Sequence, residues 1–460
     1  MSDRTTLCVL GATGFTGKFV ALEVARQISV LHKSTSSPFQ WSIAGRRKDA
    51  LEAVREEIKQ LVGASSKNDE TNVQKGLLPS IVIADVNNID SLRTLASETR
   101  LILNCVGPYY KFGENVVLAT IEASEKLKKS NRPPVHYIDL CGEPNFIERI
   151  ILEYRERAKL AGSIILPASA YDSVPAELGT IFAVSLLGKG VTPASVEMMA
   201  TFNTNGGWLA GHFATYACVV NGISPSGRQL LSRIRKKLYA NLPKATPKVA
   251  TKGFSAGIPK RQKRLGILTY DEEQDALLLP HMAADPAVVR LGQSLTMEND
   301  PKFEPVKFVG WFAVPSLYIA LFMAFYGMLI SFFSKFEVGR SLLLKYPKFF
   351  TGGVFSHEGP TQEQLDNTQF SSTFIARGVS HTALQEKTSR EPDVKAVVRV
   401  RGPEPGYVST PILFVSVARA ILVHEKDIIP GVSTPGAALR NTTLIKMIND
   451  DGRIKFDRIE

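Results

Sequence analysis

The segment Leu7–Gly17, which reads LCVLGATGFTG, constrains the fold more than any other part of the chain. A short apolar run leads into three evenly spaced glycines, and an apolar helical pattern follows, which predicts a strand, a tight turn and a helix N-terminus. Glycine permits a positive φ, and without a Cβ the backbone can approach phosphates closely. The first helical amides then face the negative charge, so the turn predicts a dinucleotide site. The contacts expected here are Gly11, Thr13, Gly14, Phe15, Thr16 and Gly17.

The next strand indicates which dinucleotide is bound. Trp41–Gly45 reads as a strand, and Arg46 and Arg47 follow it where NAD-binding domains place an acidic residue on the ribose hydroxyl. Two guanidinium groups suit a 2′-phosphate instead. The alternative is that both arginines only begin the next helix in solvent. We expect NADP(H) to be favoured over NAD(H).

Four further apolar runs predict the rest of a doubly wound parallel sheet, because strands covered on both faces read as continuous apolar stretches. These runs are 80–85, 101–107, 135–140 and 163–166. Asp85 ends the first of them and either contacts the adenosine or caps the strand. The loop after the second run lies near the nicotinamide in such sheets, so Asn104, Gly107 and Pro108 complete the expected cofactor contacts.

The net charge of +11 comes almost entirely from one segment. Residues 228–264 contain twelve basic and no acidic side chains, together with several prolines and glycines. This composition predicts a mobile, partly disordered basic insertion. Few aromatic residues accompany the charges, so we expect no nucleic acid and favour an anionic membrane surface.

The four cysteines show no metal-ligand spacing, so we expect no metal and an intracellular protein with reduced thiols. The N-terminal residues do not resemble a secretion signal, so we do not expect a secreted protein.

An uncharged segment of 26 residues, Phe308–Phe333, is long enough to meet a membrane. It allows three interpretations: a single span, a hairpin that enters and leaves on one side, or a buried core helix or helix pair. Both flanks are basic, and the chain beyond resembles the rest of an enzyme. We therefore favour a membrane-inserted apolar hairpin over residues 308–333.

Several longer strings resemble one family. GATGFTG, AGRR, NCVGPY, DLCGE and YDSVPAELG are similar to motifs of the saccharopine dehydrogenase-like oxidoreductases, which are related to trans-acting enoyl reductases. LLLKYPKFFTGGVFSHEGPT, GPEPGYVSTP and STPGAAL extend the resemblance to the C-terminus.

The resemblance implies a Rossmann domain over residues 1–170 and a second α/β (α+β) domain over 171–430 that carries the substrate cleft. A C-terminal helix over 431–460 would return to the first domain. The animal members associate with lipid droplets and membranes, and bacterial relatives reduce lipid intermediates. We therefore expect an intracellular, membrane-associated protein at a lipid droplet or the endoplasmic reticulum. The sequence leaves the oligomeric state of the protein open, and a homodimer is one of the options.

Three hypotheses about function remain open. The first is an NADPH-dependent reductase of a lipid-linked C=C or C=O group. Its proton donor would be Tyr109, beside the nicotinamide loop, or else Tyr171 or Asp172, at the entry to the second domain. No tyrosine has the lysine four residues later that short-chain dehydrogenases use, so we do not expect an active site of that type. The second is reduction of an amino-acid imine, which needs arginines such as Arg377, Arg399 and Arg401 to hold carboxylates. The third is a non-catalytic nucleotide-binding coat protein of membranes or droplets.

Overall fold

The computed structural model describes residues 4–35, 38–65, 78–265, 268–272, 275–386 and 390–460. The chain forms two compact units. Unit 1 comprises Met1–Tyr171 and Gly406–Met447, and unit 2 comprises Asp172–Pro405 and Ile448–Glu460. The chain therefore returns to unit 1 at Gly406, earlier than the predicted start at residue 431. The returning part also contains more than one helix.

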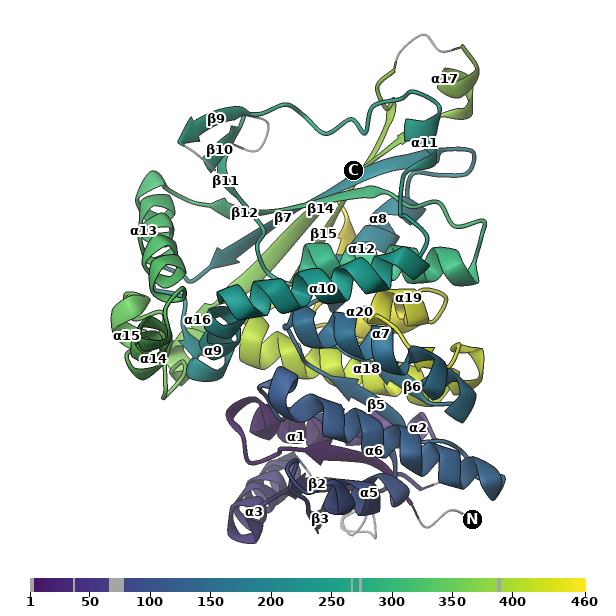
Figure 1. The fold of residues 1–460 in the computed structure, drawn as a ribbon, viewed down its shortest axis with the longest axis vertical. Helices are drawn as coiled ribbons and strands as arrows, with labels where there is room; N and C mark the ends of the chain where they lie inside the picture. Colours follow the sequence, from purple (N-terminus) through teal and green to yellow (C-terminus); the bar gives the residue numbers. More distant parts are fainter. Residues whose placement is uncertain (1–3, 36–37, 66–77, 266–267, 273–274, 387–389) are drawn as a thin grey trace. The chain divides into compact units, whose positions relative to one another are not determined.

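Unit 1 is built on a parallel sheet (Figure 1). Its strand order is β16-β6-β5-β4-β1-β2-β3, and every pairing is parallel. Without β16 this is the order 3-2-1-4-5-6 of a Rossmann domain, so the predicted fold class is confirmed. The strands are β1 (Thr5–Leu10), β2 (Trp41–Gly45), β3 (Ser80–Ile83), β4 (Thr99–Asn104), β5 (His136–Asp139), β6 (Ile164–Leu166) and β16 (Gly431–Val432).

Two sets of helices flank this sheet. In one set α5 packs against α6 and α6 against α7, and in the other α1 packs against α3 and α18. The helices of unit 1 are α1 (Phe15–Arg26), α2 (Ile28–Lys33), α3 (Lys48–Ser65), α5 (Ile89–Ser97), α6 (Tyr109–Lys129), α7 (Pro144–Ala161), α18 (Thr410–His424) and α19 (Pro435–Leu439), followed by α20 (Leu444–Asp451), which continues into unit 2.

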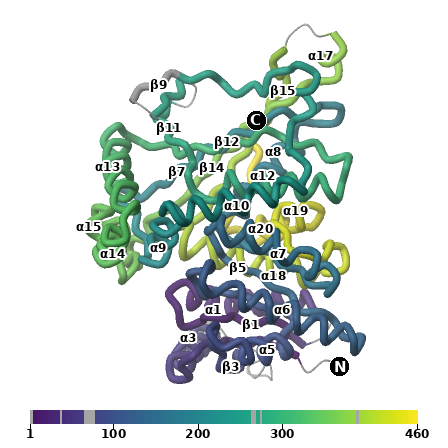
Figure 2. Tube along the Cα trace, in the orientation of Figure 1, coloured from purple at the N-terminus to yellow at the C-terminus, as the bar shows by residue number. Residues whose placement is uncertain are grey.

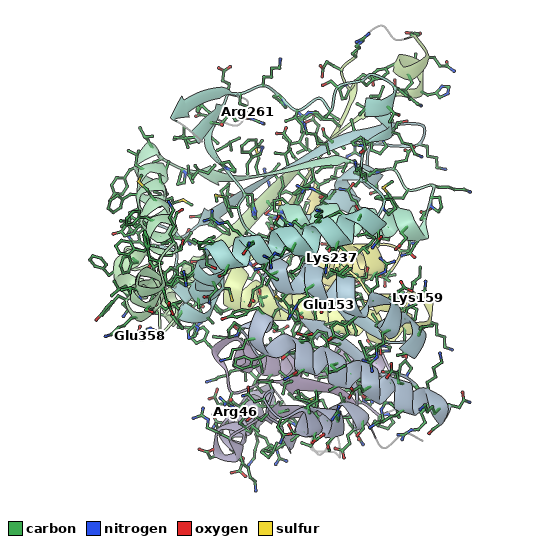
Figure 3. All side chains as sticks on the ribbon, in the orientation of Figure 1. Arg46, Glu153, Lys159, Lys237, Arg261 and Glu358 are labelled. Atoms are coloured by element: carbon green, nitrogen blue, oxygen red, sulfur yellow. The ribbon has the colours of Figure 1, made fainter. Side chains whose placement is uncertain are left out.

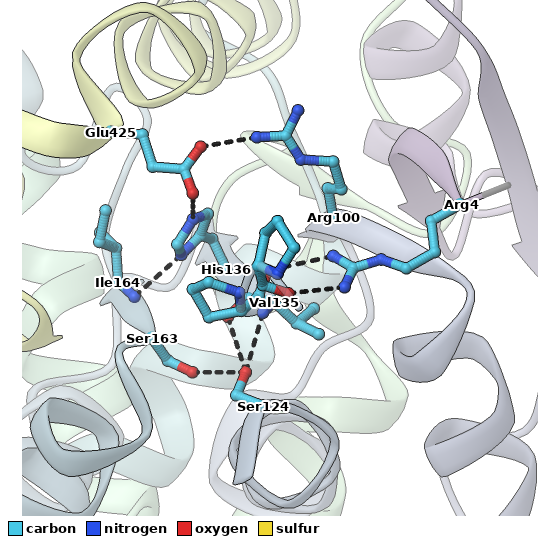
Figure 4. Close-up of polar contacts among 10 residues, drawn as sticks. Arg4, Arg100, Ser124, Val135, His136, Ser163, Ile164 and Glu425 are labelled. Atoms are coloured by element: carbon cyan, nitrogen blue, oxygen red, sulfur yellow. Dashed lines mark hydrogen bonds and ion pairs between the residues drawn. The ribbon is translucent and has the colours of Figure 1, made fainter. Parts of the chain in front are cut away.

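The returning segment is anchored at the amino ends of the central strands (Figure 4). Glu425, which follows α18, pairs with Arg100 of β4 at 2.6 Å and with His136 of β5 at 3.1 Å. The His136 Nδ1 accepts the amide of Ile164 at 3.1 Å, so its Nε2 carries the proton donated to Glu425. This hydrogen bond from His136 lowers the pKa of Glu425. The network lies at the edge of the sheet opposite the expected dinucleotide site and ties the two segments of unit 1 together.

Among the described residues, one helical stretch, Pro405–Asp427, has the length and apolar composition to cross a membrane. It contains α18, and 72% of its most apolar window is buried inside the protein. Because α18 packs on α1 within unit 1, we interpret it as a core helix.

Unit 2 contains a mixed sheet in the order β17-β15-β14-β7-β12-β11-β10-β9. β7 pairs with β12 in parallel and with β14 antiparallel, and the three lie side by side (Figure 2). The strands are β7 (Thr192–Asn203), β9 (Gln262–Leu265), β10 (Leu268–Asp271), β11 (Ala276–Pro280), β12 (Lys307–Val314), β14 (Gln369–Val379), β15 (Val394–Pro403) and β17 (Lys455–Arg458). The helices α8 (Val174–Ser185) and α12 (Asp285–Asn299) pack against each other and against this sheet.

The structure corrects the prediction of an apolar hairpin over residues 308–333. Most of its first third is β12, which pairs with β7 and β11, and the rest is one helix, α13 (Leu317–Phe333). The 17 residues of α13 extend about 26 Å, less than the roughly 30 Å of a bilayer's hydrocarbon core. A continuous apolar run does not distinguish a central strand from a buried helix, and this ambiguity caused the error.

The basic segment 228–264 is also more ordered than its composition predicted. Most of its first half lies in α10 (Pro225–Asn241), where Ile234 and Leu238 are buried at a spacing of four residues. Further along, Val249 and Phe254 join a core cluster with Ala194 and Val379. A few apolar residues at helical spacing therefore anchor a segment whose charge suggested disorder.

Candidate active site

The glycine turn after β1 has the geometry expected of a dinucleotide-binding loop. Gly11 has a φ of +87°, and a Cβ there would lie 2.6 Å from Val106 Cγ2. A Cβ on Gly17 would lie 2.1 Å from the carbonyl oxygen of Gly11, so α1 can approach the turn only because this residue is glycine. The Gly14 amide closes the turn by donating to the Gly11 carbonyl at 2.9 Å.

The N-terminus of α1 suits a diphosphate. Gly14 is its N-cap and offers no side-chain oxygen to the first helical amides. Gly14 is exposed, and Thr13, Phe15 and Thr16 are partly exposed, so the loop is accessible. An uncapped helix N-terminus behind an exposed glycine is an anion site formed by the backbone. The residues present therefore fit the pyrophosphate of a nicotinamide dinucleotide.

Arg46 and Arg47 lie next to this turn in the sheet. The Gly11 amide donates to the Ala44 carbonyl of β2 at 2.8 Å, and the two arginines directly follow β2. Arg46 is labelled in Figure 3. Both side chains are exposed, and among the described residues neither forms a side-chain hydrogen bond or ion pair. Two guanidinium groups are thus available beside the loop.

Asp85 has a local role in the structure. Its Oδ1 accepts the Asn87 amide at 2.9 Å and the Asn87 side-chain nitrogen at 3.2 Å. The carboxylate therefore braces the turn after β3, as the capping alternative predicted. Both of these contacts are made by one of the two carboxylate oxygens.

The loop after β4 is held by a chain of buried hydrogen bonds. Asn104 Nδ2 donates to the Tyr137 hydroxyl at 3.1 Å, and Asn104 Oδ1 accepts the Val106 amide at 3.0 Å. The Gly107–Pro108 bond that follows is cis. Asn104 is fully buried, so its side chain shapes the loop, while the Gly107–Pro108 backbone forms the bend that leads into α6.

Tyr109 is a poor candidate for the proton donor. Its side chain is buried, and its hydroxyl donates to the Asn104 carbonyl at 2.9 Å. Burial raises the pKa of Tyr109 well above its usual value. The proton is therefore already used in an internal hydrogen bond, and the residue packs against Phe146 instead of facing solvent.

Two acidic residues organise this region, Asp139 at the end of β5 and Glu143 at the N-cap of α7, and neither was given a role from the sequence. Asp139 Oδ1 accepts the amides of Cys141 and Ala168, and Oδ2 accepts the Tyr137 hydroxyl at 2.8 Å. Burial raises the pKa of Asp139 to about 7. Glu143 accepts the amides of Tyr109 and Tyr110 at 2.8 and 2.9 Å and so caps α6. The string DLCGE directly after an apolar run was the available signal.

Tyr171 and Asp172 are adjacent in the chain but belong to different units. Tyr171 is half-buried and ends the first segment of unit 1. Asp172 begins unit 2, and it is not the N-cap of α8, because Ser173 occupies that position. Burial raises the pKa of Asp172 to about 6. Asp172 therefore keeps its proton to a higher pH than an ordinary aspartate does.

The arginines expected for a carboxylate clamp are each paired with an acidic residue, exposed, or both. Arg377 donates to the buried Glu197 at 2.7 Å, and Arg399 and Arg401 are exposed. Arg401 also pairs with Asp457 at 3.1 Å.

Within the described residues, no group of three or more His, Cys, Asp or Glu side chains could hold a metal ion.

Comparisons with known proteins agree with the fold and with the family resemblance. The saccharopine dehydrogenase-like oxidoreductase of Mus musculus is 36% identical over 98% of this chain and 97% of its own length. A Caenorhabditis elegans protein described as a lipid droplet localized protein is 25% identical over 96% of this chain and 95% of its own.

Among solved structures, apo saccharopine dehydrogenase (L-Glu forming) from Saccharomyces cerevisiae superposes with a TM-score of 0.50. It is 11% identical and covers 99% of this chain and 100% of its own length, so it supports the fold alone. No family model matches. The near-full-length identity to the mouse protein establishes that this chain belongs to the saccharopine dehydrogenase-like oxidoreductases and is an NAD(P)-dependent oxidoreductase.

Proposed function

We propose that this protein is an NADPH-dependent reductase that acts on a hydrophobic or lipid-linked C=C or C=O group at a membrane or lipid-droplet surface. The observation that carries the cofactor choice is the pair Arg46 and Arg47. Both follow the strand to which the glycine turn is hydrogen-bonded, and both are exposed and unpaired among the described residues.

The preference for NADPH follows from charge. A 2′-phosphate carries negative charge and several acceptor oxygens, which guanidinium groups bind in a planar, bidentate manner. No acidic residue stands at the end of β2 to accept a ribose hydroxyl. In this scheme the backbone of Gly11–Gly17 holds the pyrophosphate, and the two arginines hold the adenosine phosphate. The bound reduced nicotinamide would supply the hydride.

Asp172 is the preferred proton donor of the three candidates. The hydroxyl of Tyr109 already donates to Asn104, whereas Asp172 is half-buried and has a raised pKa. A protonated carboxyl can transfer its proton to the substrate atom next to the one that receives hydride. Tyr171, also half-buried, is the second candidate.

The surface of α13 supports a hydrophobic partner. Tyr318, Leu321, Phe325, Met328 and Phe332 are spaced by three and four residues and therefore share one face of the helix. They are 67%, 52%, 56%, 69% and 54% exposed. The opposite side of α13 packs into the protein, where Ala320 is buried. A continuous exposed apolar face of this kind marks a protein or membrane interaction site.

The chain after α13 adds positive charge beside this face. Lys335, Arg340, Lys345 and Lys348 lie in or next to α14 (Glu337–Lys345) and α15 (Pro347–Phe350), which pack against α13. Each basic residue near an anionic lipid surface contributes about 1 kcal/mol to binding. Apolar side chains with basic neighbours favour a lipid surface, and the Caenorhabditis elegans relative is described as a lipid droplet localized protein. We place the protein at a lipid droplet or the endoplasmic reticulum on this basis.

The cofactor assignment is tested by calorimetric titration with NADPH and NADH. We expect tighter binding of NADPH, and Arg46→Ala combined with Arg47→Ala should remove most of that difference while NADH binding stays unchanged. Lys48→Ala is the matched control, because Lys48 is the next basic residue and lies within salt-bridge distance of Glu52. Equal losses for both nucleotides would refute the choice of NADP(H).

The substrate class is tested by following NADPH oxidation with three kinds of substrate. These are lipid enones, lipid ketones, and a mixture of a keto acid with an amino acid. Turnover with the lipid compounds alone supports the proposal. Turnover with the keto acid and amino acid would favour imine reduction. Binding of NADPH without any oxidation would favour a non-catalytic nucleotide-binding coat protein.

The lipid surface is tested by flotation with vesicles of phosphatidylcholine and phosphatidylserine. Phe325→Ser combined with Met328→Ser should reduce the floated fraction several-fold. Leu160→Ser is the control, because Leu160 is 71% exposed and lies on α7, outside the α13 face. Unchanged flotation of the double variant would exclude this face as the docking surface.

A further inference from the structure

An unusual turn leads from β15 into α18. Pro405–Ser409 winds as a π-helix, and the chain enters unit 1 at Gly406, one residue before Tyr407. π-Helices are rare, and they occur frequently at functional sites. The turn belongs to the string GPEPGYVSTP, whose one aromatic residue is Tyr407. The surroundings of Tyr407 within unit 1 therefore indicate what this turn does.

Tyr407 lies against the first turn of α1. Its ring contacts Phe15, the first residue of α1, edge to face, with ring centroids 4.9 Å apart and ring planes at 90°. It also contacts Phe19, one turn further along α1, at 6.3 Å. Phe15 and Phe19 contact each other at 5.6 Å, so the three rings form one cluster. Tyr407 is only 5% exposed, whereas Phe15 is partly exposed beside the glycine turn. The cluster therefore extends from the interior of unit 1 to the accessible loop.

The two ends of α18 lie at opposite edges of the parallel sheet. Glu425, which follows α18, pairs with Arg100 of β4 and His136 of β5 at the amino ends of these strands (Figure 4). Tyr407, which precedes α18, contacts Phe15, and Phe15 follows the carboxyl end of β1. α18 therefore runs from the carboxyl edge of the sheet, where Rossmann domains bind their ligands, to the amino edge under β4 and β5.

Tyr407 approaches the glycine turn from the side of β4 and β5. A Rossmann sheet binds one half of a dinucleotide on each half of the sheet. Arg46 and Arg47 follow β2 and mark the adenosine half, and α3 packs on β2 and β3. α1 lies between α3 and α18 (Figure 1). Since α18 ends at β4 and β5, Tyr407 stands on the side of the nicotinamide half.

An aromatic surface suits this half of the cofactor. The adenosine half of NADPH carries the charged 2′-phosphate, whereas the reduced nicotinamide is a planar and uncharged ring. Aromatic side chains offer such a ring a large apolar contact with a defined geometry. Tyr407 contacts Phe15 from the interior, and close-packed rings restrict each other's rotation, so Tyr407 fixes the orientation of Phe15.

We propose that Phe15 and Tyr407 form an aromatic wall for the nicotinamide half of the bound dinucleotide, with Phe15 as the contacting residue and Tyr407 as the positioning residue that orients it. This rests on the dinucleotide site proposed above. The backbone of Gly11–Gly17 holds the pyrophosphate, and the wall sets how firmly and in which surroundings the nicotinamide is held. The string GPEPGYVSTP thus belongs to the cofactor site.

The first test compares two ligands by calorimetry. NADPH contains both halves of the dinucleotide, and adenosine 2′,5′-bisphosphate contains only the adenosine half. Tyr407→Leu should weaken the binding of NADPH about 10-fold, the loss expected from one aromatic contact, and leave the binding of the bisphosphate unchanged. Tyr407→Phe keeps the ring and should bind both ligands like the wild-type protein. Equal weakening of both ligands by Tyr407→Leu would indicate damage to the fold or the glycine turn and would overturn the proposal.

The second test reports the surroundings of the nicotinamide and needs no turnover. The fluorescence of the reduced nicotinamide rises when the ring moves from water to an apolar site. At saturating NADPH, Tyr407→Leu should lose most of the increase that the wild-type protein gives. Phe15→Leu removes the contacting ring and should have the same effect, so it carries the test if Tyr407→Leu does not fold. An increase equal to that of the wild type in Phe15→Leu would overturn the proposal.

Two controls separate the wall from general packing. Phe19→Leu removes a ring that also contacts Tyr407 but lies one turn further from the glycine turn, so NADPH binding should stay unchanged. Tyr154→Leu removes a half-buried tyrosine of α7, whose hydroxyl donates to Glu114 at 2.8 Å, and should also leave binding unchanged. A loss with Phe19→Leu as large as that with Tyr407→Leu would assign the effect to helix packing and contradict the proposal.

The wild-type protein distinguishes failure of the wall from failure of the proposed function. A wild-type protein that prefers NADH would refute the choice of NADP(H), and the wall is then tested in the same way with NADH and AMP. A wild-type protein that binds neither NADPH nor NADH would refute both the dinucleotide site and the wall.

Discussion

Arg377 donates to Glu197 at 2.7 Å, and this pair lies in the middle of the mixed sheet of unit 2. Glu197 is fully buried, and its other oxygen accepts Arg261 at 2.6 Å and the Trp311 ring nitrogen at 3.2 Å. Arg261 also pairs with Asp271 of β10. The network occupies the one partly buried arginine that sequence reasoning offered for a substrate carboxylate. It also fastens the basic segment that contains Arg261 to the sheet.

Glu197→Gln should destabilise the protein by about 3–5 kcal/mol. The substitution leaves the largely buried guanidinium of Arg377 without a counter-charge and leaves Arg261 with Asp271 alone. The desolvation cost of an unpaired buried charge is large. Urea denaturation followed by circular dichroism measures the change. Asp457→Asn, which breaks the exposed pair with Arg401, should change the stability by less than about 1 kcal/mol. Similar losses for both variants would contradict a special role for Glu197.

Gly17→Ala should prevent α1 from seating on the glycine turn. The added Cβ would lie 2.1 Å from a backbone oxygen, which cannot rotate away like a flexible side chain. We expect a loss of several kcal/mol or no folded protein, measured by thermal melting. Gly63→Ala in α3 is the matched control: its Cβ would meet nothing within 4 Å, so it should stabilise the helix by up to about 1 kcal/mol. A Gly17→Ala protein as stable as wild type would show that the turn differs from this description.

Asp139 should make the protein less stable as pH rises. Its folded pKa of about 7 lies above the ordinary value of 3.8, so the folded state binds the proton more tightly than the unfolded state. This contribution is fully present below about pH 4 and is lost as pH rises toward 7, by about 4 kcal/mol in total. Chemical denaturation at a series of pH values measures it. Asp139→Asn does not titrate, and its stability should lack this component of the pH dependence.

Glu143→Ala should weaken the start of α6. Two backbone amides, those of Tyr109 and Tyr110, would lose their acceptor, and a capping interaction of this kind contributes about 1–2 kcal/mol. Hydrogen exchange at the first turn of α6 should accelerate together with the loss of global stability. Glu156→Ala, an exposed residue of α7, serves as the control and should leave both unchanged. Equal exchange rates in both variants would exclude the cap.

The sequence predicted unit 1 more closely than unit 2. The parallel strands were recognisable because they are short apolar runs, and β2 matches the predicted Trp41–Gly45. In unit 2 the same apolar character appears in both β12 and α13, and their division at Pro315–Ser316 depends on tertiary pairing with β7 and β11. The cofactor residues could be proposed from spacing. The role of Glu197 could not, because it arises from contacts with Arg261 and Arg377, which lie far from it in the chain.

The interleaved ends of the chain impose an order on biosynthesis. Unit 1 requires Gly406–Met447, including Glu425, and unit 2 requires β17 near the C-terminus, which pairs with β15. During translation, therefore, neither unit can reach its final form until almost the whole polypeptide has left the ribosome. A premature stop anywhere before residue 447 would leave both halves incomplete, and the nascent chain must be protected from aggregation for most of its synthesis.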